Sequence, residues 1–208
     1  MIGVSKLYCD AVEPSDALRY ERRSRDLPSH LLQFSQDKKP VVVWNVTQRC
    51  NLRCVHCYAR ATADSSEEIG TAAAKEIIDD LAEFGSPVLL LSGGEPLVRS
   101  DLSELASHAV EQGMRAVIST NGTMITREKA RELRSIGLSY VGISLDGTRE
   151  VHDRFRQVDG AFDRAMQGVE NCQLEGLKVG LRMTVSRNNA AEVPAVFDIL
   201  REREIPRV

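Results

Sequence analysis

Residues 49–58 read RCNLRCVHCY, and this short segment carries three cysteines, Cys50, Cys54 and Cys57. They are spaced as C-x3-C-x2-C, so one loop supplies three thiolates. A closed structural zinc site uses four ligands, one more than this segment offers. Three thiolates suit a [4Fe–4S] cluster in which the protein holds three irons and the fourth stays open to a small molecule. The segment therefore indicates an open iron–sulfur site, and the fold must present this loop to a ligand.

The rest of the chain has the composition of a globular protein. Its 208 residues are 42% hydrophobic and 27% charged, which argues against disorder and allows one domain with a sizeable core. A net charge of -3 gives no reason to expect a nucleic-acid or anionic-membrane partner. No apolar run is as long as a membrane span, and the start lacks a signal-peptide core. We therefore expect a cytoplasmic protein.

Cysteine usage supports the same compartment. Three of the five cysteines are crowded together, which fits metal binding in a reducing environment better than a disulfide scaffold. Cys9 and Cys172 stand alone in the sequence, and we expect both to be free thiols.

From Lys39 onward, apolar runs alternate with helical patterns. The predicted strands are residues 41–46, 88–91, 116–119, 140–145 and 179–185. The predicted helices are residues 71–84, 101–112, 126–136, 161–174 and 191–203, the first with Thr71 as its N-cap. Near-continuous apolar strands separated by helices predict an α/β fold with a parallel sheet and outer helices.

The pattern predicts a (β/α)6 barrel that is cut short at its sixth strand. Residues 205–208 resemble the beginning of that strand, and a barrel without it would leave two open sheet edges. We therefore expect the sequence to be a fragment. Residues 1–38 form an N-terminal extension in this interpretation, and residues 39–208 form an incomplete core barrel.

The distinctive polar residues follow the predicted strands one after another. In α/β barrels the reacting groups lie in the loops at the carboxyl ends of the strands. Here those loops are the cysteine segment, SGGEP (92–96), STNG (119–122), SLDG (144–147) and the cluster of Thr184, Ser186, Arg187 and Asn188. We expect the five loops to converge on one mouth.

At these motifs the chain resembles the radical S-adenosylmethionine (SAM) enzymes, in the branch that often carries a C-terminal SPASM or similar auxiliary-cluster region. HDRFR (152–156) and GAF (160–162) also stand where that family has them, and the resemblance covers about residues 39–208. Residues 28–34 and 38–47 further resemble the alternative heme-biosynthesis subgroup, above all the didecarboxysiroheme deacetylases. In this interpretation we expect the auxiliary-cluster region, with its possible second cluster, to be absent from this chain.

The resemblance implies a cofactor set and a reaction. Cys50, Cys54 and Cys57 would hold a [4Fe–4S] cluster whose open iron is chelated by SAM. Electron transfer to SAM would give a 5′-deoxyadenosyl radical, which starts removal of acetate side chains from didecarboxysiroheme and gives iron-coproporphyrin. The implied partners are a tetrapyrrole substrate and a low-potential electron donor such as ferredoxin or flavodoxin. No catalytic side chain is assigned beyond the cluster and SAM.

Several residues are expected to bind SAM. Gly93 and Gly94 allow close backbone approach, and Glu95 offers a carboxylate to the methionine amino group. Ser144 and Asp146 are expected at the ribose or carboxylate, although Asp146 alternatively shapes its turn.

Two further candidates for SAM binding each have a simpler interpretation. Arg182 is expected at the SAM carboxylate, with an exposed salt bridge as the alternative. Asn121 is a further candidate, and Thr-Asn-Gly is also an ordinary turn.

The remaining candidates each have two interpretations. His56 stands where the family has an aromatic residue, and it either covers the cluster and SAM or lies on the surface. Arg149, Arg154 and Arg156 form either an anion-pairing group for a tetrapyrrole or a solvated helix start. His152 is more simply a turn or capping histidine than a metal ligand.

Two other functions remain open at this point. A SPASM-type peptide- or protein-modifying radical SAM enzyme would share every barrel motif. A non-catalytic iron–sulfur or zinc-binding module is the more remote alternative, and His56 is the only adjacent residue able to complete a zinc site.

Overall fold

The computed structural model describes residues 39–64 and 68–208. The predicted N-terminal extension, Cys9 and the subgroup resemblance at residues 28–34 lie outside the described residues. None of the described helices is long and apolar enough to cross a membrane.

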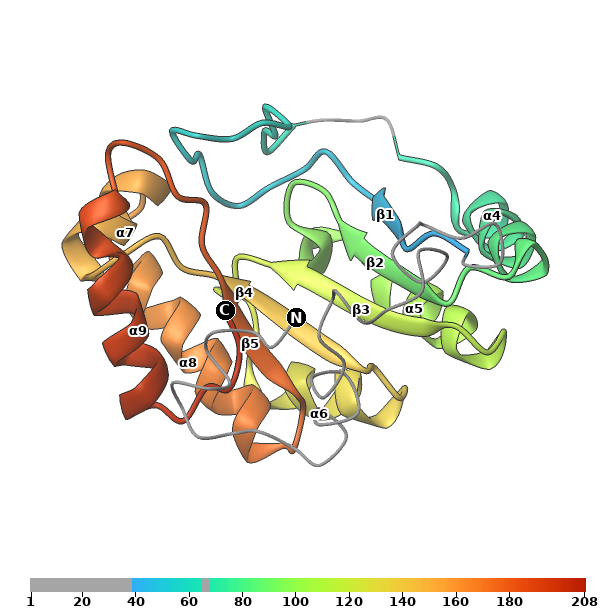
Figure 1. Cartoon of the computed structure of the whole chain (residues 1–208). Coiled ribbons are helices and arrows are strands. Elements are labelled where there is room, and N and C mark those ends of the chain that lie inside the picture. The colour runs from blue at the N-terminus through green and yellow to red at the C-terminus, as the bar shows by residue number, and fades with distance from the viewer. Residues whose placement is uncertain (1–38, 65–67) are drawn as a thin grey trace, which may run out of the picture.

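In the described part of the chain, five parallel strands form one sheet, and their spatial order follows their order in the sequence (Figure 1). The strands are β1 (Val42–Asn45), β2 (Val88–Ser92), β3 (Arg115–Thr120), β4 (Tyr140–Ser144) and β5 (Val179–Arg182). Each strand pairs in parallel with the next one along the chain. This confirms the predicted α/β class and the incomplete barrel.

Helices connect the strands and cover the sheet. They are α4 (Thr71–Phe84), α5 (Leu102–Glu111), α6 (Arg127–Ser135), α7 (Arg149–Arg156), α8 (Ala161–Leu174) and α9 (Val193–Glu202), with short 3-10 helices η2 (Pro96–Val98) and η3 (Ala190–Glu192). Figure 1 shows α4 and α5 beside the first strands and α8 and α9 beside the last ones. The polar ends of all five strands therefore remain together at one edge.

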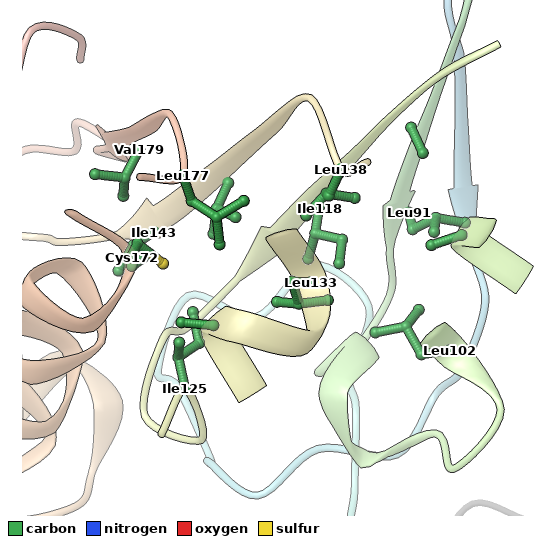
Figure 2. Close-up of a cluster of buried hydrophobic side chains, with 14 of the residues drawn as sticks. Leu91, Leu102, Ile118, Ile125, Leu133, Leu138, Ile143, Cys172, Leu177 and Val179 are labelled. Carbon is green, nitrogen blue, oxygen red and sulfur yellow. The ribbon is translucent and has the colours of Figure 1, made fainter. Parts of the chain in front are cut away.

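One hydrophobic core lies between the strands and the helices. Figure 2 shows Leu91, Ile118 and Ile143 of successive strands among side chains of the helices and their connections. Leu133 of α6 and Cys172 of α8 are fully buried in the same cluster. Cys172 is a free thiol, as predicted, and its burial in the core raises its pKa to about 12.

Three local predictions are wrong. Gly70, not Thr71, is the N-cap of α4, and the Thr71 hydroxyl donates to Asp101 Oδ2 at 2.6 Å. The sequence pattern did not predict helix α7. Only three of its eight residues, His152, Phe155 and Arg156, are buried, which is too few to produce a clear helical period. The last strand ends at Arg182, before residue 185. Beyond it, the Arg207 carbonyl accepts the Leu181 N–H at 2.8 Å, although residues 205–208 form no assigned strand.

Candidate functional site

A cavity of about 240 Å³ opens at the carboxyl ends of the strands. All five strand ends or their following loops contribute to its lining, from the cysteine loop after β1 to Thr184 after β5. The predicted convergence of five loops is therefore confirmed. Such an edge of a parallel barrel is where ligands bind, because the loops there are free to vary while the strands hold them in place.

The three cysteines of the loop all line this cavity. Cys50, Cys54 and Cys57 are free and half-buried, and the Cys50 N–H donates to the Thr62 carbonyl at 3.0 Å. Burial raises the pKa of the Cys50 thiol, opposed by the N–H of Leu52. In the described part of the chain, no three His, Cys, Asp or Glu side chains surround a single metal-ion position. Thiolates that each bind a different iron need not converge on one point, so three cysteines around one cavity fit a [4Fe–4S] cluster.

Gly93 and Gly94 line the cavity and also fix the cysteine loop. The Gly94 N–H donates to the Thr47 carbonyl and the Glu95 N–H to the Arg49 carbonyl, each at 2.8 Å. A Cβ at Gly93 would lie 2.3 Å from the Thr47 oxygen, and the Gly93 φ of 138° is itself a glycine conformation. The loop after β2 is thus packed backbone against backbone on the segment that leads into the cysteines.

Glu95 lies behind the cavity wall and is not part of its lining. Its side chain is fully buried and accepts the Thr120 hydroxyl at 2.6 Å, the Asn121 N–H at 2.7 Å and the Leu97 N–H at 3.1 Å. Burial raises the pKa of this carboxyl, and these three hydrogen bonds oppose the rise. The structure therefore places the Glu95 side chain as a tie between the loops after β2 and β3, away from the cavity where SAM is expected.

Asn121 lines the cavity and connects two loops. Its Nδ2 donates to Asn51 Oδ1 at 2.8 Å, which ties the end of β3 to the cysteine loop. Its Oδ1 accepts the backbone N–H of Thr123 at 2.9 Å and so also forms a turn. The structure thus shows the turn formed by Asn121, and SAM binding by its side chain stays a prediction.

Of the last three predicted SAM contacts, only Ser144 lines the cavity. The Asp146 side chain is fully buried, and its backbone N–H donates to His152 Nδ1 at 3.1 Å. The Arg182 side chain lies across Gly142, where an added Cβ would be 2.2 Å from Arg182 Nε. No ion pair of Arg182 is found within the described residues, so the alternative of an exposed salt bridge is not supported.

Arg156 is a site residue whose role the sequence interpretation missed. It lines the cavity from the last residue of α7, is almost fully buried, and donates through Nη1 to Cys54 Sγ at 3.4 Å. Its Nη2 lies 2.8 Å from Asp146 Oδ2 in an ion pair. The sequence feature that could have indicated this role is the closeness of SLDG (144–147) to HDRFR (152–156). These two motifs supply a buried carboxylate, Asp146, and a buried guanidinium, Arg156.

The predicted anion-pairing group of three arginines is not formed. Arg149 is ion-paired with Asp163, and Arg154 is exposed. Arg149 and Arg156 are seven residues apart in α7, which separates them by about 10 Å along the helix axis, and Arg154 faces another side. Only Arg156 reaches the cavity.

The two histidines near the site have different positions. His56 lines the cavity, with its ring centroid 5.4 Å from that of Phe155 and its Nε2 3.7 Å from Asp146 Oδ2. Burial lowers the His56 pKa, while Asp146 acts in the opposite direction. His152 is buried, accepts the Asp146 N–H, and has its pKa lowered to about 3 by burial and then by Arg156. It is the predicted turn histidine.

The sequence of this chain is similar to those of known proteins. The model of the Radical SAM superfamily matches residues 44–200. The chain is 64% identical over 209 residues to Fe-coproporphyrin III synthase of Methanosarcina barkeri, covering 100% of this chain and 52% of that protein. It is 43% identical over 170 residues to pre-heme d1 synthase of Dinoroseobacter shibae, covering 81% and 42% respectively. The chain thus spans about half the length of these relatives.

The fold is similar to that of solved structures. Native anSMEcpe with bound AdoMet, which is SAM, superimposes with a TM-score of 0.68 at 21% sequence identity. The match covers 79% of this chain and 49% of that one. At this identity the comparison supports the barrel architecture alone.

Proposed function

This chain belongs to the radical SAM superfamily, and we propose that it is the SAM-cleaving part of an enzyme of siroheme-dependent heme biosynthesis. The observation that carries the proposal is the gathering of Cys50, Cys54 and Cys57 with Gly93 and Gly94 around one cavity. When bound, a [4Fe–4S] cluster supplies the single electron that cleaves SAM to methionine and a 5′-deoxyadenosyl radical.

The protein's own residues would bind and orient these groups. The three cysteines would hold the cluster, and the Gly93–Gly94 backbone would leave room for the methionine part of SAM. Ser144 and Asn121 offer a hydroxyl and an amide on the same cavity wall. We assign Glu95 and Asp146 to holding the loops in place, since both carboxylates are fully buried. Arg182 remains a candidate for the SAM carboxylate from the neighbouring strand.

We propose a tetrapyrrole substrate, with removal of acetate side chains from didecarboxysiroheme to give iron-coproporphyrin. The support is the similarity to two proteins whose names refer to Fe-coproporphyrin III and to a heme precursor. The proposal extends to a low-potential ferredoxin or flavodoxin as electron donor, to a cytoplasmic location, and to a second cluster outside this chain.

Anaerobic reconstitution tests the cofactor part of the proposal. We expect iron and sulfide in near-equal amounts, and an electron paramagnetic resonance signal of the reduced protein that changes when SAM is added. A signal that does not change when SAM is added, or zinc in place of iron and sulfide, would contradict the cofactor part of the proposal.

Incubation with didecarboxysiroheme, SAM and a reductant tests the substrate part. Mass spectrometry should show loss of two acetate groups together with formation of 5′-deoxyadenosine. SAM cleavage that leaves the tetrapyrrole unchanged while a peptide is modified would instead favour a peptide-modifying enzyme.

A further inference from the structure

We propose that Arg156 acts on the cluster through Cys54. The hydrogen bond from Arg156 Nη1 to the Cys54 sulfur raises the reduction potential of the cluster. This inference rests on the proposed function for the presence of the cluster. It assigns to the HDRFR segment a task at the cofactor, where the sequence interpretation had placed substrate carboxylates.

The geometry forms a chain of alternating charge. The Asp146 carboxylate lies 2.8 Å from Arg156 Nη2, and Arg156 Nη1 lies 3.4 Å from Cys54 Sγ. The exposed fractions are 0% for Asp146 and 7% for Arg156, so water screens the pair little. The guanidinium of Arg156 serves both groups, because it is ion-paired with the Asp146 carboxylate through Nη2 and donates a hydrogen bond to Cys54 Sγ through Nη1.

The Arg156 side chain is held in this position by its surroundings. The Val55 N–H donates to the Phe155 carbonyl at 2.9 Å, which joins the cysteine loop to the end of α7. On the other side, His152 Nδ1 accepts the Asp146 N–H, and Asn189 Nδ2 donates to the Asp146 carbonyl at 3.0 Å. The Asp146 backbone and the loop that carries Cys54 are therefore both held in place.

The direction of the effect follows from charge. Reduction adds one electron and therefore one negative charge to the cluster and its thiolates. A nearby guanidinium and a hydrogen bond from an N–H group to a ligand sulfur both stabilise the reduced, more negative form of the cluster. Arg156 therefore makes reduction easier, and Asp146, as a fixed negative charge behind it, limits how far the potential rises.

These opposite signs give the test. The reduction potential of the cluster is measured by redox titration of the reconstituted protein without SAM, followed by electron paramagnetic resonance. SAM is added afterwards, and a change in the signal shows that the titrated cluster is the one that binds SAM. Arg156→Met should make the reduction equilibrium about tenfold less favourable, which is 59 mV for one electron. Asp146→Asn should shift the potential in the opposite direction. Arg156→Lys, which keeps the charge, should fall between wild type and Arg156→Met.

Two further variants keep the test decisive. Arg156→Met leaves the buried Asp146 without its partner, so the double variant Asp146→Asn/Arg156→Met removes both charges and should also have a lowered potential. Arg134→Met is the matched control, because Arg134 is exposed in the last turn of α6, which runs away from the cavity. Its potential should equal that of wild type.

The outcomes separate the two proposals. A wild-type protein that forms no SAM-responsive cluster would refute the proposed function. A cluster that loads normally in both Arg156→Met variants with an unchanged potential would overturn this inference. The inference is equally overturned if only SAM affinity falls, since Arg156 would then act on SAM and not on the cluster.

Discussion

Gly94 and Arg49 approach each other so closely that a Cβ at Gly94 would lie 2.2 Å from the Arg49 carbonyl oxygen. This contact joins the loop after β2 to the start of the cysteine loop. The two segments are also linked by the hydrogen bond from the Glu95 N–H to the same Arg49 carbonyl. The cavity wall and the cysteine loop are therefore one packed unit.

Gly94→Ala should destabilise the protein and reduce cluster loading. The added methyl group meets backbone atoms that have no free space, and overpacking of this kind costs about 1–3 kcal/mol. Urea unfolding and iron analysis measure the two effects. Gly70→Ala is the control, because nothing lies within 4 Å of its added Cβ and its φ of -62° is open to alanine. An equal change in both variants would contradict the close-contact explanation.

Cys54→Ala should abolish cluster loading and SAM cleavage together, because it removes one of the three thiolates at the cavity. Iron content and production of 5′-deoxyadenosine are the measurements. Cys172→Ala is the matched control, since Cys172 of α8 is buried in the core and its replacement should leave both readouts near wild type. SAM cleavage that persists without iron would contradict the assignment.

Glu95→Gln should weaken the tie between the loops after β2 and β3. Glutamine keeps one acceptor oxygen and has a donor NH2 group in place of the other, so the buried donor of either Thr120 or Asn121 loses its acceptor at a cost of about 1–3 kcal/mol. Urea unfolding of the cluster-free protein reports this loss. Glu111→Gln, at an exposed position in α5, should change stability by less than about 0.5 kcal/mol.

The stability of the cluster-free protein should fall as the pH is lowered from about 6.5 toward 3, through His152. Its folded-state pKa of about 3 lies below the ordinary histidine value of 6.5, so in this window the unfolded state binds more protons and acid favours unfolding. His152→Gln keeps a hydrogen-bond acceptor but does not titrate. Urea unfolding at pH 7 and pH 5 should show that the wild type loses more stability than the variant; equal losses would show that His152 contributes nothing to the pH dependence.

Leu133→Ala should cost about 2–5 kcal/mol of unfolding free energy, because it leaves a cavity in a fully buried part of the core (Figure 2). Leu174→Ala is the comparison, since that side chain is 58% exposed at the end of α8. Thermal or urea unfolding of the two variants should therefore differ clearly. Similar losses would mean that α6 does not pack as the structure describes.

The sequence alone predicted the α/β architecture of the described residues except for helix α7. Strands such as Val88–Ser92 are continuous apolar runs, and helices such as Ala161–Leu174 have a helical period, so local pattern identified them. Parallel strands bring their carboxyl ends to one edge, which is why the cavity could be predicted from the residues after each strand. The eight residues of α7 were missed because their pattern is short and mostly charged.

Only the tertiary structure decided which way the polar side chains of those loops face. Gly93, Gly94, Asn121 and Ser144 line the cavity, whereas Glu95 and Asp146 turn into the interior. The sequence does not distinguish a carboxylate of SGGEP or SLDG that contacts a ligand from one that contacts a buried neighbour. The Arg156–Cys54 contact joins residues 102 positions apart, and no local pattern encodes such a pair. The sequence determined where the site would form, and packing between distant loops decided which residues line the cavity and which ones hold those loops in place.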